Sequence, residues 1–205
     1  MGGNKVRKFE FFMADALQND KDCCIAIGAI QSNHARVAAA SALHCGLAAY
    51  LLLMGERPPV EKGNLTLDYM LGAKITYIPP IFDFQERLNA MQKLGDSLEQ
   101  RGRNPYVFPV VSPMGCLGPL MAMQETLKQA EMMNIHFDHQ FIPVGSGVRL
   151  AGLVMGAVFE SPELETVGVC IGRDRELMKL IFENLCVQFA DIIGLRGDEK
   201  TGSSD

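Results

Sequence analysis

The stretch that decides the fold runs from residue 23 to residue 55 and reads CCIAIGAIQSNHARVAAASALHCGLAAYLLLMG. It opens and closes with short apolar runs at 23–28 and 48–53, and between them lies an Ala-rich segment of helical period at 33–46. Short apolar runs bounded by turn residues indicate buried strands. A strand, a helix and a second strand in this order predict a right-handed crossover between two parallel strands.

The same alternation continues along the rest of the chain. We expect strands at 23–28, 48–53, 74–79, 106–110, 140–145 and 166–171, and helices at 33–46, 64–73, 84–101, 117–133, 149–159 and 176–193. This pattern predicts an α/β fold with open parallel sheets and flanking helices. Ligands of such sheets bind at the carboxyl ends of the strands, so the loops after residues 28, 110 and 145 are the places to search. The polar, Gly-rich segment 194–205 is expected to be a disordered tail.

Composition and charge exclude several classes of protein. The 205 residues are 48% hydrophobic and 21% charged, which fits one soluble α/β domain or two small lobes. The net charge is -5 and the Lys and Arg residues are scattered, so we expect no nucleic-acid partner. The longest apolar stretch, 46–55, is far shorter than the roughly 20 residues that cross a bilayer. We therefore expect no membrane span.

The cysteines and the N-terminus indicate a reducing compartment. Six cysteines lack any CxxC spacing and mostly sit in apolar segments, as unpaired buried thiols do, so no metal site is expected. Charged residues interrupt the first apolar run, which argues against a signal peptide. Together these features predict a cytoplasmic protein.

The loop GSG at 145–147 is the first candidate for chemistry. Gly145, Ser146 and Gly147 follow a predicted strand and precede a predicted helix. Small residues at that place let backbone N–H groups approach an anion at the positive end of the helix, which suits a phosphate. A turn from strand to helix also carries glycine for backbone geometry alone, so both interpretations stay open.

The loop GAIQSNHAR at 28–36 is the second candidate. It gathers Gln31, Ser32, Asn33 and His34 at the start of a predicted helix. Ser32 or Asn33 can simply be the N-cap of that helix, and His34 can be a surface residue on its first turn. An N-cap explains one of these polar residues and leaves the others for binding or catalysis. Arg36 is expected on a solvated or salt-bridged face.

Lys5 is the third candidate. A lysine forms a Schiff base with a carbonyl cofactor when its surroundings supply neutral amine, and Gly2 and Gly3 would allow a ring to approach closely. The alternative is a charged helix face, because Arg7 and Lys8 are close by in the sequence.

Five stretches, taken in order, carry a resemblance to a known family. They are GGNKVRKFEF (2–11), GAIQSNHARVAAASA (28–42), GNLTLDYMLGAKI (63–75), SPMGCLG (112–118) and the segment from GSG to AGL (145–153). The sequence resembles the D-cysteine desulfhydrase and 1-aminocyclopropane-1-carboxylate deaminase family of pyridoxal-phosphate enzymes over residues 2 to about 193. That family has the tryptophan-synthase-β-like fold, also called fold type II.

The resemblance implies a role for each candidate residue. Lys5 matches the lysine that holds pyridoxal phosphate as a Schiff base and moves the substrate proton. Asn33 matches the asparagine at the ring hydroxyl of the cofactor, and Ser32 matches the catalytic group that receives the substrate carboxylate. His34 stands with them in the substrate site and leans toward the desulfhydrase branch. Residues 145–147 match the start of the phosphate loop.

The implied reaction is α,β-elimination of D-cysteine, or a related small amino acid, to pyruvate, ammonia and hydrogen sulfide. A homodimer is the expected assembly. Because family members extend beyond both ends of this sequence, the resemblance implies a small domain at 8–116 and an incomplete large domain formed by 1–7 and 117–193. An inactive truncated fragment or isoform of the family is the alternative function, and exposed apolar surface on the incomplete part is expected to cause association.

Two residues depart from the phosphate-loop pattern of the family. Val148 is β-branched at a place where the backbone must approach an anion closely. Arg149 is able to compensate by pairing with the phosphate.

Overall fold

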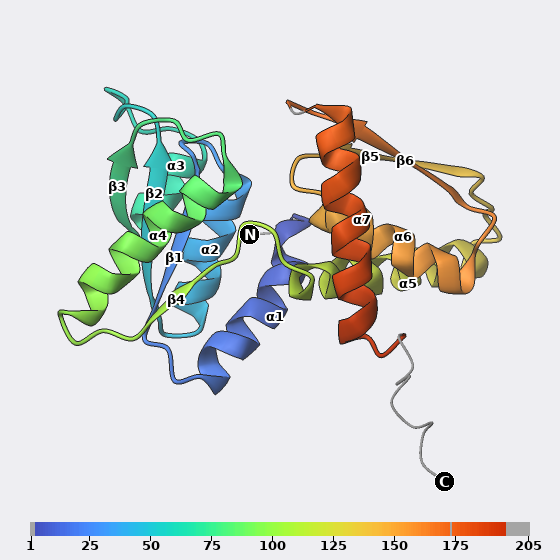
Figure 1. Ribbon diagram of the computed structural model, residues 1–205, viewed down its shortest axis with the longest axis horizontal. Helices are drawn as coiled ribbons and strands as arrows, with labels where there is room; N and C mark the ends of the chain where they lie inside the picture. Colours follow the sequence, from blue (N-terminus) through green and yellow to red (C-terminus); the bar gives the residue numbers. More distant parts are fainter. Residues whose placement is uncertain (1–2, 173, 196–205) are drawn as a thin grey trace, which may run out of the picture. The chain divides into compact units, whose positions relative to one another are not determined.

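Two units, residues 1–110 and 111–205, make up the chain, and the computed structural model describes residues 3–172 and 174–195. The elements of the first unit are α1 (Lys5–Gln18), β1 (Cys23–Ala29), α2 (Asn33–His44), β2 (Ala48–Met54), α3 (Asn64–Met70), β3 (Lys74–Ile78), α4 (Phe84–Glu99) and β4 (Pro105–Val107). Those of the second are the 3₁₀ helix η1 (Met114–Cys116), α5 (Leu117–Met132), β5 (His139–Val144), α6 (Val148–Glu160), β6 (Glu165–Cys170) and α7 (Arg175–Ile192). Figure 1 shows them in chain order by colour.

The first unit is built on a four-stranded parallel sheet with the order β3-β2-β1-β4. β1 pairs with β2 along its whole length, from Cys23 opposite Ala48 to Ala29 opposite Met54. The chain leaves β1 through α2 toward β2 on one side, whereas β4 lies on the other side of β1. The order of strands therefore reverses between β1 and β4, and the carboxyl end of β1 is where a ligand is expected.

Helices cover both faces of this sheet. On one face, Ile25 and Leu52 pack with Met91 and Leu98 of α4. On the other face α2 packs on β1 and β2, with four fully buried alanines: Ala35, Ala38, Ala39 and Ala42. Small side chains let α2 approach the strands closely, which explains the Ala-rich sequence of this helix.

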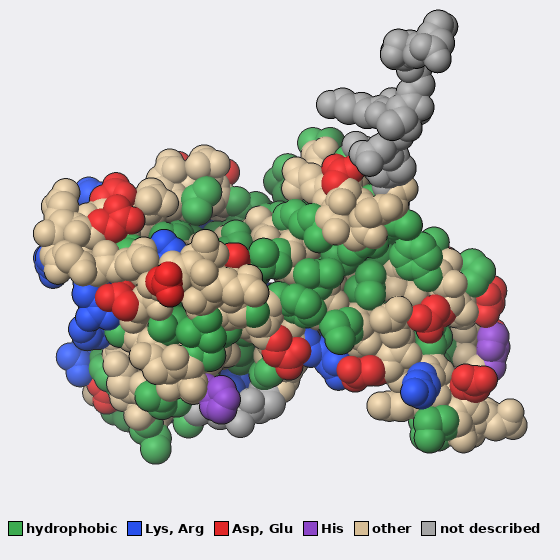
Figure 2. Space-filling model, turned by 90° about the horizontal axis from the view of Figure 1, so that it is seen from below, with side chains coloured by type: hydrophobic (Ala, Val, Ile, Leu, Met, Phe, Trp, Pro, Cys, Tyr) green, Lys and Arg blue, Asp and Glu red, His purple; other side chains and the backbone are tan. Residues whose placement is uncertain are grey.

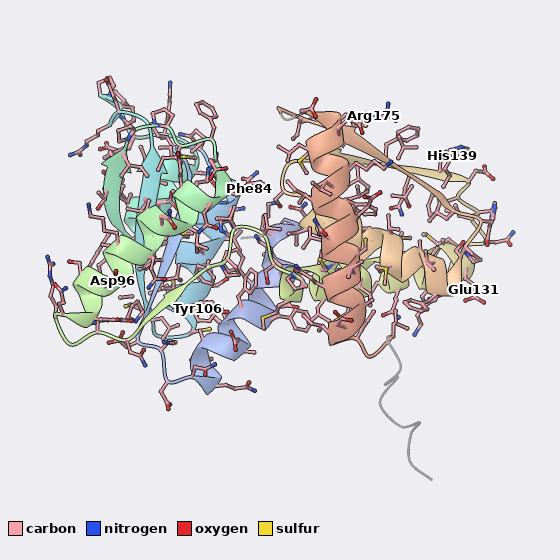
Figure 3. The ribbon with its side chains drawn as sticks, viewed as in Figure 1. Phe84, Asp96, Tyr106, Glu131, His139 and Arg175 are labelled. Carbon is pink, nitrogen blue, oxygen red and sulfur yellow. The ribbon has the colours of Figure 1, made fainter. Side chains whose placement is uncertain are left out.

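α1 precedes the first element expected from the sequence. Phe9, Phe12 and Ala16 are almost completely buried, and α1 packs on α2. Figure 3 shows Tyr106 on β4, and its hydroxyl donates to Oδ2 of Asp15 on α1 at 2.6 Å. In the sequence, charged residues stand between the apolar residues of α1, so its apolar face is hard to recognise.

The second unit has a smaller sheet, in which β5 pairs in parallel with β6. α6 connects these two strands and packs closely against α5. A Cβ on Gly152 would collide with the carbonyl oxygen of Cys116, and one on Gly156 would lie 2.9 Å from the carbonyl oxygen of Leu120. Glycine is therefore required at both positions by the close approach of α6 to its neighbours.

The predicted α/β architecture with parallel sheets and flanking helices is confirmed. The end predicted for the strand at 106–110 is wrong, because β4 stops at Val107. Pro109 has no backbone N–H to donate to a neighbouring strand. The helix expected at 64–73 ends earlier, at Met70, and Gly72 then adopts a positive φ of 72°.

The domain division at 8–116 stays a prediction. Contacts within this chain place the boundary between 110 and 111. Most of the expected tail, residues 196–205, lies outside the described residues. In the part of the chain that is described, no helix combines the length and the apolar character needed to cross a membrane.

Candidate active site

The loop at the carboxyl end of β1 leads directly into α2. Ser32 is the N-cap of this helix, and its Oγ accepts hydrogen bonds from the backbone N–H groups of His34 and Ala35, each at 3.2 Å. A Cβ at Gly28 would collide with the Ser32 side chain, so glycine is needed there. The N-cap interpretation of Ser32 is thus correct, and the loop presents its remaining polar groups at the positive end of α2.

A hydrogen-bond network joins this loop to the start of α3. Nδ2 of Asn64 donates to Oδ1 of Asn33 and to the carbonyl oxygen of Gln31, each at 2.9 Å. The Gln31 side chain reaches back, because its Oε1 accepts from the backbone N–H of Asn64 at 2.9 Å. This hydrogen bond orients the Asn33 amide, and its NH₂ group is then available to donate to a ligand.

Asn64 was not a candidate from the sequence, although it lies in one of the stretches that carry the resemblance. The Gly-Asn pair before a helical segment was the available signal. Gly63 has a positive φ of 62°, and a Cβ there would lie 2.5 Å from Oε1 of Gln31. The glycine therefore makes room for the network.

His34 lies in the first turn of α2, half-buried among aromatic rings. Its imidazole centroid is 5.0 Å from that of Phe9 and 6.3 Å from that of Phe108. Burial, reinforced by the positive charges of Lys8 and Lys5, holds the pKa of His34 well below its usual 6.5. The ring is consequently neutral at neutral pH. Its Nδ1 is buried and has no hydrogen-bond partner among the described residues, which calls for a functional explanation.

Lys5 is the first residue of α1 and is half-buried. The backbone turns sharply just before it, because Gly3 has a φ of +110° and its carbonyl accepts from the N–H of Val6 at 3.1 Å. Phe9 of the same helix has its ring centroid 5.0 Å from that of His34, so the beginning of α1 lies near the first turn of α2. Asn4 is exposed, and its side chain does not cap α1.

The GSG turn lies between β5 and α6 in the second unit. Gly147 is left-handed, with φ 81°, and no side chain caps the N-terminus of α6. The first N–H groups of a helix have no partner inside it, so this end offers donors and a positive dipole to an anion. A Cβ on Gly145 would meet nothing within 4 Å. The turn is therefore open at the residue that follows β5.

The two departures in this loop have structural explanations. Val148 is 6% exposed and packs in the core with Leu185 and Phe189. Its side chain therefore does not obstruct the turn. Nη2 of Arg149 donates to the carbonyl oxygen of Pro143 at 3.2 Å, which fastens the first turn of α6 to β5.

The donor set fits a cofactor that carries an aldehyde, a ring hydroxyl and a phosphate. In the first unit, Ser32, Asn33 and His34 lie at the start of α2. In the second unit, the turn at 145–147 precedes α6. A comparison with protein families matches residues 1–181 to the family described as pyridoxal-phosphate dependent enzyme. The chain belongs to this family. Membership confirms the predicted fold class, and pyridoxal phosphate as the cofactor that the family uses.

Relatives within the pyridoxal-phosphate family have two named activities. The chain is 37% identical over 180 residues to the D-cysteine desulfhydrase of Serratia proteamaculans, covering 84% of this chain and 54% of that protein. It is 29% identical over 205 residues to the 1-aminocyclopropane-1-carboxylate deaminase of Methylobacterium nodulans, covering 96% of this chain and 60% of that protein. The chain thus spans less than two thirds of the length of these relatives.

A solved structure of the same family is also similar. The crystal structure of an ACC deaminase homologue superposes with a TM-score of 0.86 at 36% identity, covering 94% of this chain and 58% of that one. The similarity at this level of identity supports both the fold and the family.

Proposed function

We propose that this chain supplies the pyridoxal-phosphate site of a lyase that acts on a small amino acid, with D-cysteine as the first substrate to test. One observation supports the proposal: the helix that begins at Lys5 packs, through Phe9, against His34 at the capped N-terminus of α2. The relatives named as a desulfhydrase and a deaminase both support a reaction of this class.

The cofactor, when bound, supplies an aldehyde that condenses with amines and a ring that accepts electrons from the substrate's α-carbon. We assign the aldehyde to the amine of Lys5 and the phosphate to the N–H groups of residues 145–147. Asn33 donates its NH₂ group to the ring hydroxyl, because Asn64 already holds its oxygen. Asn64 is therefore a positioning residue for Asn33.

Ser32 and α2 bind the substrate carboxylate in this proposal. The Ser32 Oγ accepts two backbone hydrogen bonds, which leaves its own O–H to donate to a carboxylate oxygen. The helix dipole favours an anion at the same place. Lys5 is the base that we assign to the removal of the proton from the α-carbon.

His34 stays neutral in this site because it is buried and lies near Lys5 and Lys8. A neutral imidazole binds a thiol or thiolate leaving group by one hydrogen bond without adding a positive charge beside Lys5. This is the residue we expect to separate a desulfhydrase from a deaminase. His34→Gln keeps a hydrogen-bonding side chain of similar size and is the matched variant.

We also propose a cytoplasmic location and a homodimer. Unpaired cysteines, among them the buried Cys23, Cys24 and Cys116, suit a reducing compartment. Exposed apolar side chains such as Phe141 and Ile171 favour association with a second copy.

The test is a product assay on the full chain loaded with pyridoxal phosphate. We expect D-cysteine to give equal amounts of pyruvate and sulfide, and we expect Lys5→Arg, which keeps the charge but cannot form a Schiff base, to give neither. Ammonia released from 1-aminocyclopropane-1-carboxylate without sulfide from D-cysteine would redirect the substrate assignment to the deaminase. The absence of any turnover with either compound would favour an inactive member of the family.

A further inference from the structure

The Gln31 side chain joins the loop after β1 to the segment between β2 and α3. Its Nε2 donates to the carbonyl oxygen of Lys62 at 2.9 Å, and its Oε1 accepts from the backbone N–H of Asn64 at 2.9 Å. One side-chain amide therefore binds two backbone groups, one on each side of Gly63. The residues that it joins are 31 and 33 positions away in the sequence.

Gln31 supplies a cap that α3 does not have in its own sequence. α3 has seven residues, of which Leu65 and Asp68 are buried, and a helix this short is not stable by itself. The first N–H groups of a helix have no partner inside it, and the side chain of the N-cap residue usually accepts from one of them. The N-cap of α3 is Gly63, which has no side chain, and Gln31 accepts from the first N–H instead.

The loop between β2 and α3 lies beside the loop after β1 at both of its ends. A Cβ on Gly55 would lie 2.8 Å from Cδ1 of Ile30, and one on Gly63 would lie 2.5 Å from Oε1 of Gln31. The N–H of Gly55 donates to the carbonyl oxygen of Ile78 at 2.8 Å, which continues the pairing of β2 with β3. The sheet thus holds the first end of the loop, and the Gln31 amide holds the second.

The start of α3 in turn orients Asn33. The side-chain amide of Asn64 donates to the carbonyl oxygen of Gln31 and to Oδ1 of Asn33, each at 2.9 Å. An amide nitrogen has two N–H donors, so these two hydrogen bonds use both of them. A displacement of the Asn64 backbone would therefore remove the donor that holds the Asn33 oxygen.

We propose that Gln31 is a positioning residue: its side-chain amide fixes the start of α3, and Asn64 then holds the Asn33 amide in the orientation that binds the cofactor. The role of Asn33 at the cofactor rests on the proposed function, whereas the ordering of α3 does not. Gln31 acts through Asn64 and does not bind the cofactor itself. Because small displacements of a binding group weaken its action strongly, two hydrogen bonds that fix Asn64 have a functional reason.

The first experiment measures hydrogen exchange of the Asn64 backbone amide in the full chain without cofactor. Gln31→Met keeps the length of the side chain and removes both hydrogen bonds, so exchange at this amide should rise on the order of tenfold. Parental exchange in Gln31→Met would overturn the inference. Faster exchange across β1 and β2 as well would also overturn it, because Gln31 would then support the whole unit.

Gln31→Glu is the conservative variant. A carboxylate of the same length still accepts from the N–H of Asn64, and a negative charge is favourable at the start of a helix. Exchange at Asn64 should therefore stay within about threefold of the parental rate. Exchange as fast as that of Gln31→Met would overturn the inference, because the acceptor on residue 31 would then not protect this amide.

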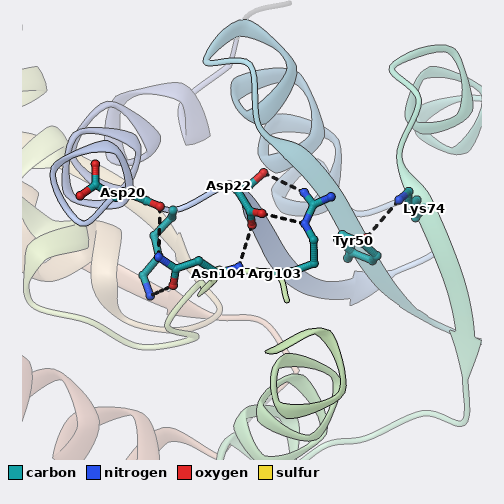
Figure 4. Close-up of polar contacts among 7 residues, drawn as sticks. Asp20, Asp22, Tyr50, Lys74, Arg103 and Asn104 are labelled. Atoms are coloured by element: carbon teal, nitrogen blue, oxygen red, sulfur yellow. Dashed lines mark hydrogen bonds and ion pairs between the residues drawn. The ribbon is translucent and has the colours of Figure 1, made fainter. Parts of the chain in front are cut away.

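Asn104 offers a matched control at the opposite end of the same sheet. Its side-chain amide also joins distant segments, because Nδ2 donates to the carbonyl oxygen of Asp20 at 3.1 Å and Oδ1 accepts from Nζ of Lys21 at 2.8 Å (Figure 4). Asn104→Leu removes these hydrogen bonds and should leave exchange at Asn64 unchanged. An equal rise in exchange in Asn104→Leu and Gln31→Met would overturn the inference.

A second readout reports on Asn33 through the affinity for pyridoxal phosphate. Gln31→Met should weaken binding on the order of tenfold in the parent, but by less than about twofold in the Asn33→Ala background, because Gln31 acts through Asn33. An equal loss in both backgrounds would overturn the inference. If the parent does not bind the cofactor, the proposed function fails, and the exchange experiment still decides whether Gln31 fixes the start of α3.

Discussion

The two sheets of this chain differ in how completely their own units bury them. All residues of β1 except Ala29 are buried, and β2 is buried or half-buried along its length. In β5 and β6, by contrast, Val144 alone is buried, and Phe141 is 67% and Ile171, directly after β6, 59% exposed. Figure 2 shows other hydrophobic side chains at the surface, on the face seen from below.

The first unit covers its own sheet, whereas the second does not. A parallel sheet is normally covered on both faces, and the first unit satisfies this rule with α2 and α4. The second unit leaves the apolar side chains of a two-stranded sheet exposed, as surfaces that bind further protein do. The start of α2, with Ser32, Asn33 and His34, is therefore ordered by its own unit.

The most destabilising change is expected from shortening a buried side chain in the first sheet, in comparison with replacing an exposed one in the second. Leu51→Ala, in β2, removes a fully buried side chain and should destabilise the first unit by about 2–5 kcal/mol. Phe141→Ser should change stability by no more than about 0.5 kcal/mol and should reduce association. All four tyrosines lie at or before residue 106, so tyrosine fluorescence during urea unfolding follows the first unit alone. Hydrogen exchange in β1 and β5 compares the stability of the two variants. An equal loss of stability in both would contradict the difference in burial between the two sheets.

Asp68→Asn should stabilise the first unit at high pH. The folded-state pKa of Asp68, about 7, is raised above the unfolded 3.8, so the folded protein holds the extra proton and stability falls as pH rises between these values. The neutral side chain avoids this loss, and we expect a gain of roughly 2 kcal/mol at pH 8 that shrinks toward pH 4. Tyrosine fluorescence at both pH values measures it.

Asp22→Asn is the control with the opposite sign. Although burial opposes the shift, hydrogen bonds from Asn104 and the charge of Arg103 lower the pKa of Asp22. Its stabilising effect is therefore present above pH 3.8 and lost as pH falls, and the variant should be less stable at pH 8. A stability gain of Asp22→Asn at pH 8 would contradict the lowered pKa of Asp22.

Gly152→Ala tests the packing of the second unit. The new Cβ would collide with the carbonyl oxygen of Cys116, so α6 must move away from η1 and α5, and we expect a loss of about 1–3 kcal/mol. Gly145→Ala is the matched variant, because its Cβ would meet nothing within 4 Å. Hydrogen exchange in α5 and α6 should rise for the first variant alone, and unchanged exchange in Gly152→Ala would mean that α6 packs less closely than described.

Loss of a helix cap should have the smallest effect, and it can be compared between the units. Ser32→Ala and Asp174→Ala each remove an N-cap that accepts two backbone N–H groups, and each should destabilise its helix by about 1 kcal/mol. Only Ser32→Ala should also weaken the binding of substrate. A raised KM in both variants would argue against a role for Ser32 beyond capping.

The sequence predicted most of the fold because apolar periods and turn residues mark the strands and helices from residue 23 onward. It missed α1, whose buried side chains Phe9 and Phe12 are interspersed with charged residues. The predicted end of β4 was wrong because the apolar stretch at 106–110 continues through Pro109.

The candidate site was predictable where polar residues follow a strand, as at Ser32, Asn33 and His34. The network through Asn64 was not, because it joins two loops that are 31 residues apart in sequence. Asp68 was equally hidden, since one acid in a short helix gives no sign that it is buried. The roles of Lys5 and of residues 145–147 stay predictions.

The role of Lys5 can be tested by mapping where pyridoxal phosphate attaches. The full chain is incubated with the cofactor, reduced with borohydride, digested and analysed by mass spectrometry, beside Lys5→Arg and the matched variant Lys8→Arg on the same helix. We expect one modified peptide, carrying the reduced cofactor on Lys5, in the parent and in Lys8→Arg, and none in Lys5→Arg. Modification of Lys8, or equal labelling of several exposed lysines in all three proteins, would contradict it.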